Sequence, residues 1–121
     1  MKPIVLVALG GALGSVLRFG ISQIIVVSWK TFPWQTFLIN LLGSLLIGTL
    51  LGVIEDRKGS TDVLMYFGMI GFCGGFTTFS TFSKESIQLL QHQQYVTVII
   101  YVLLSVIVGV ALTALGYYWA K

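Results

Sequence analysis

The chain has 121 residues, of which 56% are hydrophobic and only 9% are charged, and its mean hydropathy is +0.95. A soluble domain carries charged side chains on about a quarter of its residues, so this composition excludes an ordinary soluble protein. The formal net charge is +3, but the basic residues are scattered and form no patch that would bind nucleic acid. In a membrane protein such an excess indicates anchoring at the ends of the spans.

A membrane span needs about 20 mostly apolar residues to cross about 30 Å of hydrocarbon. Four segments meet this requirement: residues 3–27, 36–54, 63–90 and 96–119. Polar residues fall in the connections between them, and Trp29 and Trp34 in the first connection suit the membrane interface. The sequence therefore predicts an all-α integral membrane protein, with one four-helix domain over residues 1–121.

Four spans place both termini on the same side of the membrane. The basic residues then divide unevenly, with Lys2, Arg57, Lys58 and Lys121 on the side of the termini and Lys30 and Lys84 on the other. Positive residues favour the cytoplasmic side, and this distribution favours cytoplasmic termini only weakly. Insertion in both orientations therefore stays open.

The third span differs from the others in its glycine and hydroxyl content. Gly74 and Gly75 directly precede Thr77 and Thr78, and such a stretch is poor at sustaining a helix. Irregular backbone in a membrane survives only where it is buried in protein or lines a polar cavity. We predict a break in the helix between Gly74 and Thr78, the alternative being an unbroken helix whose small residues pack closely.

Small and polar residues recur every four positions in the other three spans. The stripes are Gly10, Gly14 and Arg18 in the first span, Asn40, Ser44, Gly48 and Gly52 in the second, and Tyr101, Ser105, Gly109 and Thr113 in the fourth. Such stripes usually mark the faces along which membrane helices pack. Arg18 and Asn40 need a further explanation, because charged and amide side chains are costly within a span.

Arg18 has two interpretations: a side chain that caps the carbonyl groups of a neighbouring helix, or a charge beside an anion pathway. Asn40 could form a hydrogen bond between helices, but Ser44 continues the same helix face, which favours a polar path. Phe79 and Phe82, three residues apart, project from one face. Hydroxyl groups of Ser80 and Thr81 flank them, and ring edges together with O–H and N–H donors suit a small anion.

Other function classes lack the residues that they require. The single cysteine, Cys73, excludes a disulfide framework, and the single histidine, His92, lies in a polar turn, so no catalytic constellation is present. The acidic residues lie in the loop at 55–62 or, for Glu85, near the end of the third span. Proton-coupled exporters of organic cations use a buried carboxylate, and the sequence indicates none.

Residues 71–83, with the sequence GFCGGFTTFSTFS, resemble the signature of the CrcB/Fluc fluoride channel family. The similarity extends over the chain: residues 10–19 (GGALGSVLRF) resemble the first helix of the family and residues 36–44 (TFLINLLGS) its second. The resemblance implies a passive channel in the inner (plasma) membrane that exports fluoride from the cytoplasm. It further implies a dual-topology, antiparallel homodimer with two pores.

The resemblance also implies roles for individual residues. The fluoride pore would contain Asn40, Phe79, Phe82, Ser80, Thr81, Tyr101 and Ser105. Arg18 would face the aqueous vestibule. The backbone carbonyl groups of Gly74 and Thr77 would hold a structural sodium ion where the two copies meet. The alternative function is a small proton-coupled multidrug exporter of similar size, which the lack of a buried carboxylate disfavours.

Overall fold

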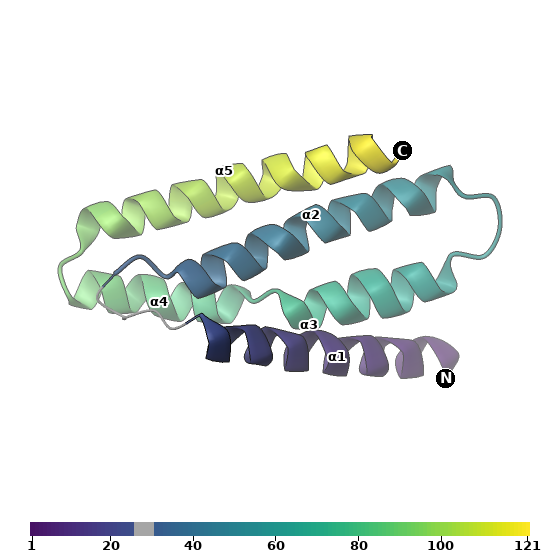
Figure 1. The fold of residues 1–121 in the computed structure, drawn as a ribbon, viewed down its shortest axis with the longest axis horizontal. Helices are drawn as coiled ribbons and strands as arrows, with labels where there is room; N and C mark the ends of the chain where they lie inside the picture. The colour runs from purple at the N-terminus through teal and green to yellow at the C-terminus, as the bar shows by residue number, and fades with distance from the viewer. Residues whose placement is uncertain (26–30) are drawn as a thin grey trace.

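The fold is described from a computed structural model that covers residues 1–25 and 31–121. The end of the predicted first span at residue 27, and the predicted interfacial Trp29 with its neighbour Lys30, lie outside these residues. The described chain is all-helical, as predicted, and four of its helical segments are long and apolar enough to cross a membrane. Figure 1 shows them side by side, with both termini at one end of the bundle.

The four segments lie close to the predicted spans. The first is α1 (Lys2–Ile24), the second α2 (Trp34–Asp56) and the fourth α5 (Tyr95–Ala120). The third consists of η1 (Val63–Cys73), α3 (Gly74–Phe76) and α4 (Phe79–Gln91). The first turn of α1 contains Pro3, where the missing N–H costs little. Gln35 at the start of α2 donates from Nε2 to the Ser22 carbonyl (2.8 Å) and to that of Ile25, so it caps the end of α1.

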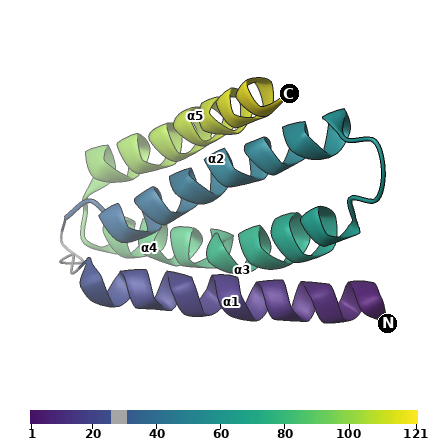
Figure 2. The ribbon, with the colours of Figure 1, turned by 45° about the vertical axis from the view of Figure 1, so that its right-hand side comes forward.

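The helices form two close pairs, α1 with η1 and α3, and α2 with α5 (Figure 2). Glycine allows each pair to approach at backbone distance. A Cβ atom on Gly14 would collide with the Phe72 carbonyl oxygen, and one on Gly48 would collide with that of Thr113. Thr113 also donates from its hydroxyl to the Ser44 carbonyl at 3.1 Å. The stripes predicted on the second and fourth spans therefore face each other.

The third span begins as a π-helix, in which η1 forms wider turns with i to i+5 hydrogen bonds. Nothing in the sequence pattern indicated this. The span then breaks after Phe76, where Thr77 (φ −87°, ψ 159°) and Thr78 (φ −150°, ψ 119°) are extended before α4 begins. The predicted break is confirmed, but only its last two residues leave the helix, and Gly74 and Gly75 remain helical.

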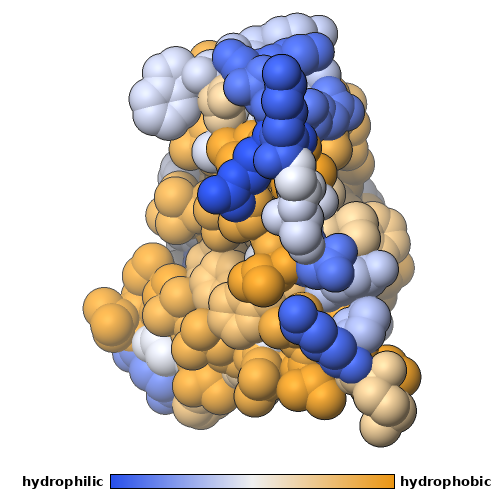
Figure 3. Space-filling model, turned by 90° about the vertical axis from the view of Figure 1, so that its right-hand side faces the viewer, coloured by the Kyte–Doolittle hydropathy of each residue, from blue (hydrophilic) through white to orange (hydrophobic). Residues whose placement is uncertain are grey.

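Polar side chains collect at the end of the bundle that carries both termini and the α2–η1 loop. Figure 3 looks onto this end and shows a hydrophilic band with hydrophobic side chains around it. Along the spans, large apolar side chains are exposed, among them Val16 on α1 and Val110 on α5, both more than 60% accessible. An apolar flank with polar ends is the surface of a protein whose solvent is lipid.

Candidate functional site

The break in the third span frees backbone groups, and a side chain from α2 binds two of them. Asn40 accepts a hydrogen bond from the Thr78 N–H at Oδ1 (2.9 Å) and donates from Nδ2 to the Thr78 carbonyl (3.2 Å). The Thr78 hydroxyl in turn accepts from the Thr81 N–H at 3.3 Å and caps α4. Both interpretations of Asn40 therefore have support, because it links two helices and does so at irregular backbone.

A second partner comes from α1. The Arg18 Nε donates to the Gly75 carbonyl at 3.0 Å, and the Ser15 hydroxyl lies 3.5 Å from the same oxygen. In a continuous helix that carbonyl would accept from the Phe79 N–H, which the break moves away. Arg18 thus caps a neighbouring helix, the first of its two predicted interpretations. It also lines a cavity, as described below.

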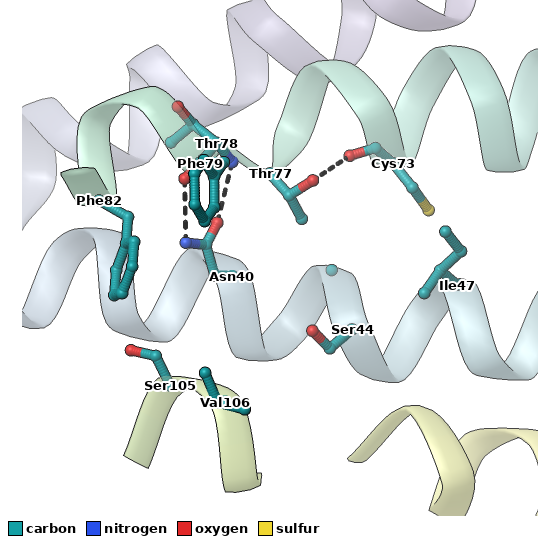
Figure 4. Close-up of a pocket in the computed structure, with 11 residues that line it drawn as sticks. Asn40, Ser44, Ile47, Cys73, Thr77, Thr78, Phe79, Phe82, Ser105 and Val106 are labelled. Carbon is teal, nitrogen blue, oxygen red and sulfur yellow. Dashed lines mark hydrogen bonds between the residues drawn. The ribbon is translucent and has the colours of Figure 1, made fainter. Parts of the chain in front are cut away.

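A groove opens beside the break, between the third span, α2 and α5. It has a volume of about 370 Å³, and its lining includes Asn40, Ser44, Thr77, Phe79, Phe82 and Ser105. Figure 4 shows Asn40 reaching to Thr78, with the two phenylalanine rings beside it. The ring centroids of Phe79 and Phe82 are 5.7 Å apart, and Phe79 is 79% exposed. Four of the seven predicted pore residues thus meet in one place or at its edge.

A smaller cavity of about 310 Å³ lies on the other side of the break. Arg18, Ser22, Gln35 and Thr81 are among its lining residues. Thr78 lines both cavities, so the irregular residues separate a groove with aromatic rings from a cavity with a guanidinium group. The second interpretation of Arg18, a charge beside a polar space, is compatible with this geometry.

The remaining predicted residues are placed differently. Tyr101 is 0% exposed, and its ring packs on Phe82 with centroids 4.9 Å apart. Thr81 belongs to the Arg18 cavity, and its hydroxyl accepts from that of Thr78 at 3.1 Å. Ser80 is exposed, with its hydroxyl 3.4 Å from the same Thr78 hydroxyl. The hydroxyl groups are therefore linked through Thr78 rather than arranged along one wall.

A partly buried carboxyl group on α4 was not predicted from the sequence. Thr36 and Tyr101 lie beside the carboxyl group of Glu85. Glu85 Oε1 and the Tyr101 hydroxyl are both buried, and neither has a hydrogen-bond partner within residues 1–25 and 31–121. Glu85 as a whole is half-buried and lies near the end of the third span, as expected, but α5 and the start of α2 cover one of its two carboxyl oxygens. The position of Glu85 two turns after Phe79 was the available signal.

The family of this chain follows from its similarity to known proteins. Residues 5–117 match the family described as CrcB-like protein, Camphor Resistance (CrcB). The chain belongs to this family. Three curated CrcB relatives carry the name fluoride-specific ion channel FluC. That of Azobacteroides pseudotrichonymphae is 45% identical over 97% of this chain and 94% of its own length. That of Flavobacterium psychrophilum is 44% identical over 100% and 98%, and that of Thermus thermophilus 41% over 97% and 94%.

Membership of the CrcB family extends over almost the whole chain, and all four candidate spans fall within or next to the matched region. The chain is a multi-pass protein of the inner membrane. The residues that line the groove and the Arg18 cavity all fall within the matched region. These two spaces beside the break are therefore the candidate site of this CrcB chain.

Proposed function

We propose that the chain is a fluoride channel that lets fluoride leave the cytoplasm passively. The relatives that align with the full chain are named as fluoride-specific ion channels, not as enzymes. The observation that carries the site assignment is the groove at the break, where Asn40, Phe79, Phe82 and Ser105 meet.

The chemistry of the groove suits a small, strongly hydrated anion. The edges of the Phe79 and Phe82 rings carry the positive end of the ring quadrupole, and the Ser105 hydroxyl supplies an O–H donor. Asn40 holds the Thr78 peptide in place and thereby fixes the position of Phe79, the next residue. On the other side of the break Arg18 supplies a positive charge that raises the local concentration of anions.

The functional form in this proposal is an antiparallel homodimer with one pore on each side. In a single copy Gly74 and Ser80 are exposed in the middle of the third span. Polar groups facing hydrocarbon would lack partners, and a second, inverted copy would cover them. A twofold axis then repeats the groove, which gives two equivalent pores. The weak bias in basic residues permits insertion in both orientations.

We also propose that sodium binds where the two copies meet. No hydrogen bond within residues 1–25 and 31–121 engages the carbonyl groups of Gly74 and Thr77, and Gly74 has open space beside it. Hard cations take oxygen ligands of this kind, so the carbonyl groups fit, and the bound ion would compensate them. Replacing sodium by N-methylglucamine should lower the dimer fraction in detergent; an unchanged fraction would remove the sodium ion from the proposal.

Fluoride efflux from liposomes tests the channel. Purified protein is reconstituted into vesicles loaded with potassium fluoride, valinomycin dissipates the potential, and a fluoride electrode records the release. Phe82→Ile and Asn40→Asp should abolish efflux while the dimer persists on size exclusion. Phe72→Ile is the matched control, because Phe72 stacks on Phe76 outside the groove (5.7 Å). Full efflux in both groove variants would refute the pore assignment.

Orientation needs its own experiment. Cys73→Ala removes the single cysteine, and Ser60→Cys then places one thiol in the exposed α2–η1 loop. A membrane-impermeant maleimide should label about half of the molecules in sealed cells and the rest after permeabilisation. Labelling of all or none before permeabilisation would show a single orientation and exclude the antiparallel dimer.

The proton-coupled exporter remains the second candidate, because one carboxyl oxygen of Glu85 is buried, although Glu85 lies near the end of its span rather than at mid-membrane. The names of the relatives favour the channel. Proton release from vesicles upon addition of organic cations, lost in Glu85→Gln, would reverse that preference.

A further inference from the structure

A row of aromatic rings leads from the groove to the end of the bundle where α2 begins. It starts at Phe79 and Phe82 and continues through Tyr101 to Phe32, which lies just before α2. Among residues 1–25 and 31–121, the Phe32 ring contacts three other rings, with centroid distances of 4.7 Å to Trp34, 5.1 Å to Phe37 and 5.4 Å to Tyr101. No pattern in the sequence indicated a role for Phe32.

Tyr101 lies between two phenylalanine rings from different parts of the chain. Phe82 of α4 packs on it at 4.9 Å with a tilt of 53°, and Phe32 meets it edge to face at 5.4 Å and 79°. Tyr101 belongs to a buried core with Phe37, against which Phe32 and Phe82 both pack. The orientation of the Tyr101 ring therefore depends on Phe32 as well as on the groove.

Phe32 is held where it is by its own backbone surroundings. Its carbonyl accepts from the Trp34 N–H at 2.8 Å, and the residue between them, Pro33, is buried. Proline restricts the backbone of the residue before it to extended conformations. The ring is thus presented to Tyr101 by a short, constrained segment, so little conformational entropy is lost when it packs there.

We propose that Phe32 is a positioning residue for the pore: it fixes the ring of Tyr101 and, through Tyr101, the ring of Phe82. This inference rests on the proposed function for its effect on fluoride and on the ring contacts for its mechanism. Removing the Phe32 ring leaves a space beside Tyr101 into which that ring can turn. Phe82 then loses the surface that holds it at the groove.

Three variants of Phe32 and one matched control test the effect on efflux. Phe32→Ala removes the ring, Phe32→Leu keeps apolar volume without an aromatic edge in case the alanine variant does not fold, and Phe32→Tyr restores the ring. Trp34→Ala is the control, because Trp34 packs on Phe32 and Phe37 but makes no ring contact with Tyr101 in the described part of the chain. Efflux should fall roughly fivefold or more in the alanine and leucine variants and stay within about twofold of wild type in Phe32→Tyr and Trp34→Ala.

A second readout does not depend on fluoride. Tetranitromethane nitrates accessible tyrosines, and mass spectrometry of the peptides locates the nitro groups. Tyr101 should stay unmodified in the wild type and in Trp34→Ala but react in Phe32→Ala and Phe32→Leu. Tyr118, 73% exposed, and Tyr95, 58% exposed, serve as internal references.

The two readouts separate the possible failures. Nitrated Tyr101 with slowed efflux in the alanine or leucine variant supports the inference. Protected Tyr101 in both variants overturns it, as does nitrated Tyr101 with wild-type efflux, or a Trp34→Ala variant as slow as Phe32→Ala. A wild-type protein that releases no fluoride would contradict the proposed function, and the nitration pattern would then decide alone whether Phe32 positions Tyr101.

Discussion

Replacing Asn40 by alanine should weaken the fold at the break in the third span. The substitution removes two hydrogen bonds, of 2.9 Å and 3.2 Å, to the N–H and carbonyl of Thr78. Each bond contributes about 0.5–1.5 kcal/mol net, so the pair contributes about 1–3 kcal/mol. Interhelical hydrogen bonds in membranes average about 0.6 kcal/mol each, so the expected loss lies near the lower end of that range. The loss is larger if the N–H and carbonyl of Thr78 find no new hydrogen-bond partner.

The assay is reversible unfolding in mixed micelles by titration with sodium dodecyl sulfate, followed by circular dichroism. All variants are compared at one protein concentration, because a dimer's stability depends on concentration. Ser44→Ala is the matched control: it lies one helical turn along α2, lines the same groove, and its hydroxyl donates no hydrogen bond in the described part of the chain. If Asn40→Ala and Ser44→Ala unfold at the same denaturant fraction, Asn40 does not hold the break.

Three further substitutions address other contacts, and the same unfolding assay measures them. Arg18→Gln removes the hydrogen bond from the charged guanidinium group to the Gly75 carbonyl. It should lower the free energy of unfolding by about 1.5–3 kcal/mol, the range for hydrogen bonds to charged groups. A smaller loss than that of Ser15→Ala would contradict this. Gly48→Leu should cost about 1–3 kcal/mol or prevent folding, because its side chain meets backbone of α5, whereas Gly20→Leu, with nothing within 4 Å, should be tolerated. Tyr101→Phe should leave stability unchanged or raise it, since the lost hydroxyl is buried and has no hydrogen-bond partner among the described residues; a clear loss would mean that the hydroxyl is bound.

The sequence predicted the features that depend on composition and local pattern. Apolar runs of membrane length marked the spans, the paired glycines and threonines marked the break, and the four-residue stripes marked the faces of α2 and α5 that meet. In each case the physical cause acts within one segment, such as the poor helix propensity of Thr77 and Thr78.

The features that the sequence did not reveal depend on which segments meet. In the sequence Glu85 is only a residue near the end of a span. The burial of its Oε1 atom results from the contact of α4 with α5 and the start of α2. For Arg18 the sequence predicted carbonyl groups of a neighbouring helix as one of two possible partners, but it could not identify the Gly75 carbonyl, because a backbone group is not visible in the residue types. The sequence places Phe32 in a loop. Its contact with Tyr101 was not predictable, because the two residues are far apart in the chain.

The break has an electrostatic consequence for the middle of the membrane. A helix carries about half a positive elementary charge at its amino end and half a negative one at its carboxyl end. Since the third span is interrupted, the carboxyl end of η1 and α3 and the amino end of α4 both lie at depth, where few ions screen them. Arg18, on the Gly75 carbonyl, has the sign that the first of these ends favours. The first turn of α4 contains no acidic residue, so no carboxylate of that turn offsets its positive end, which begins at Thr78 and Phe79 on the wall of the groove.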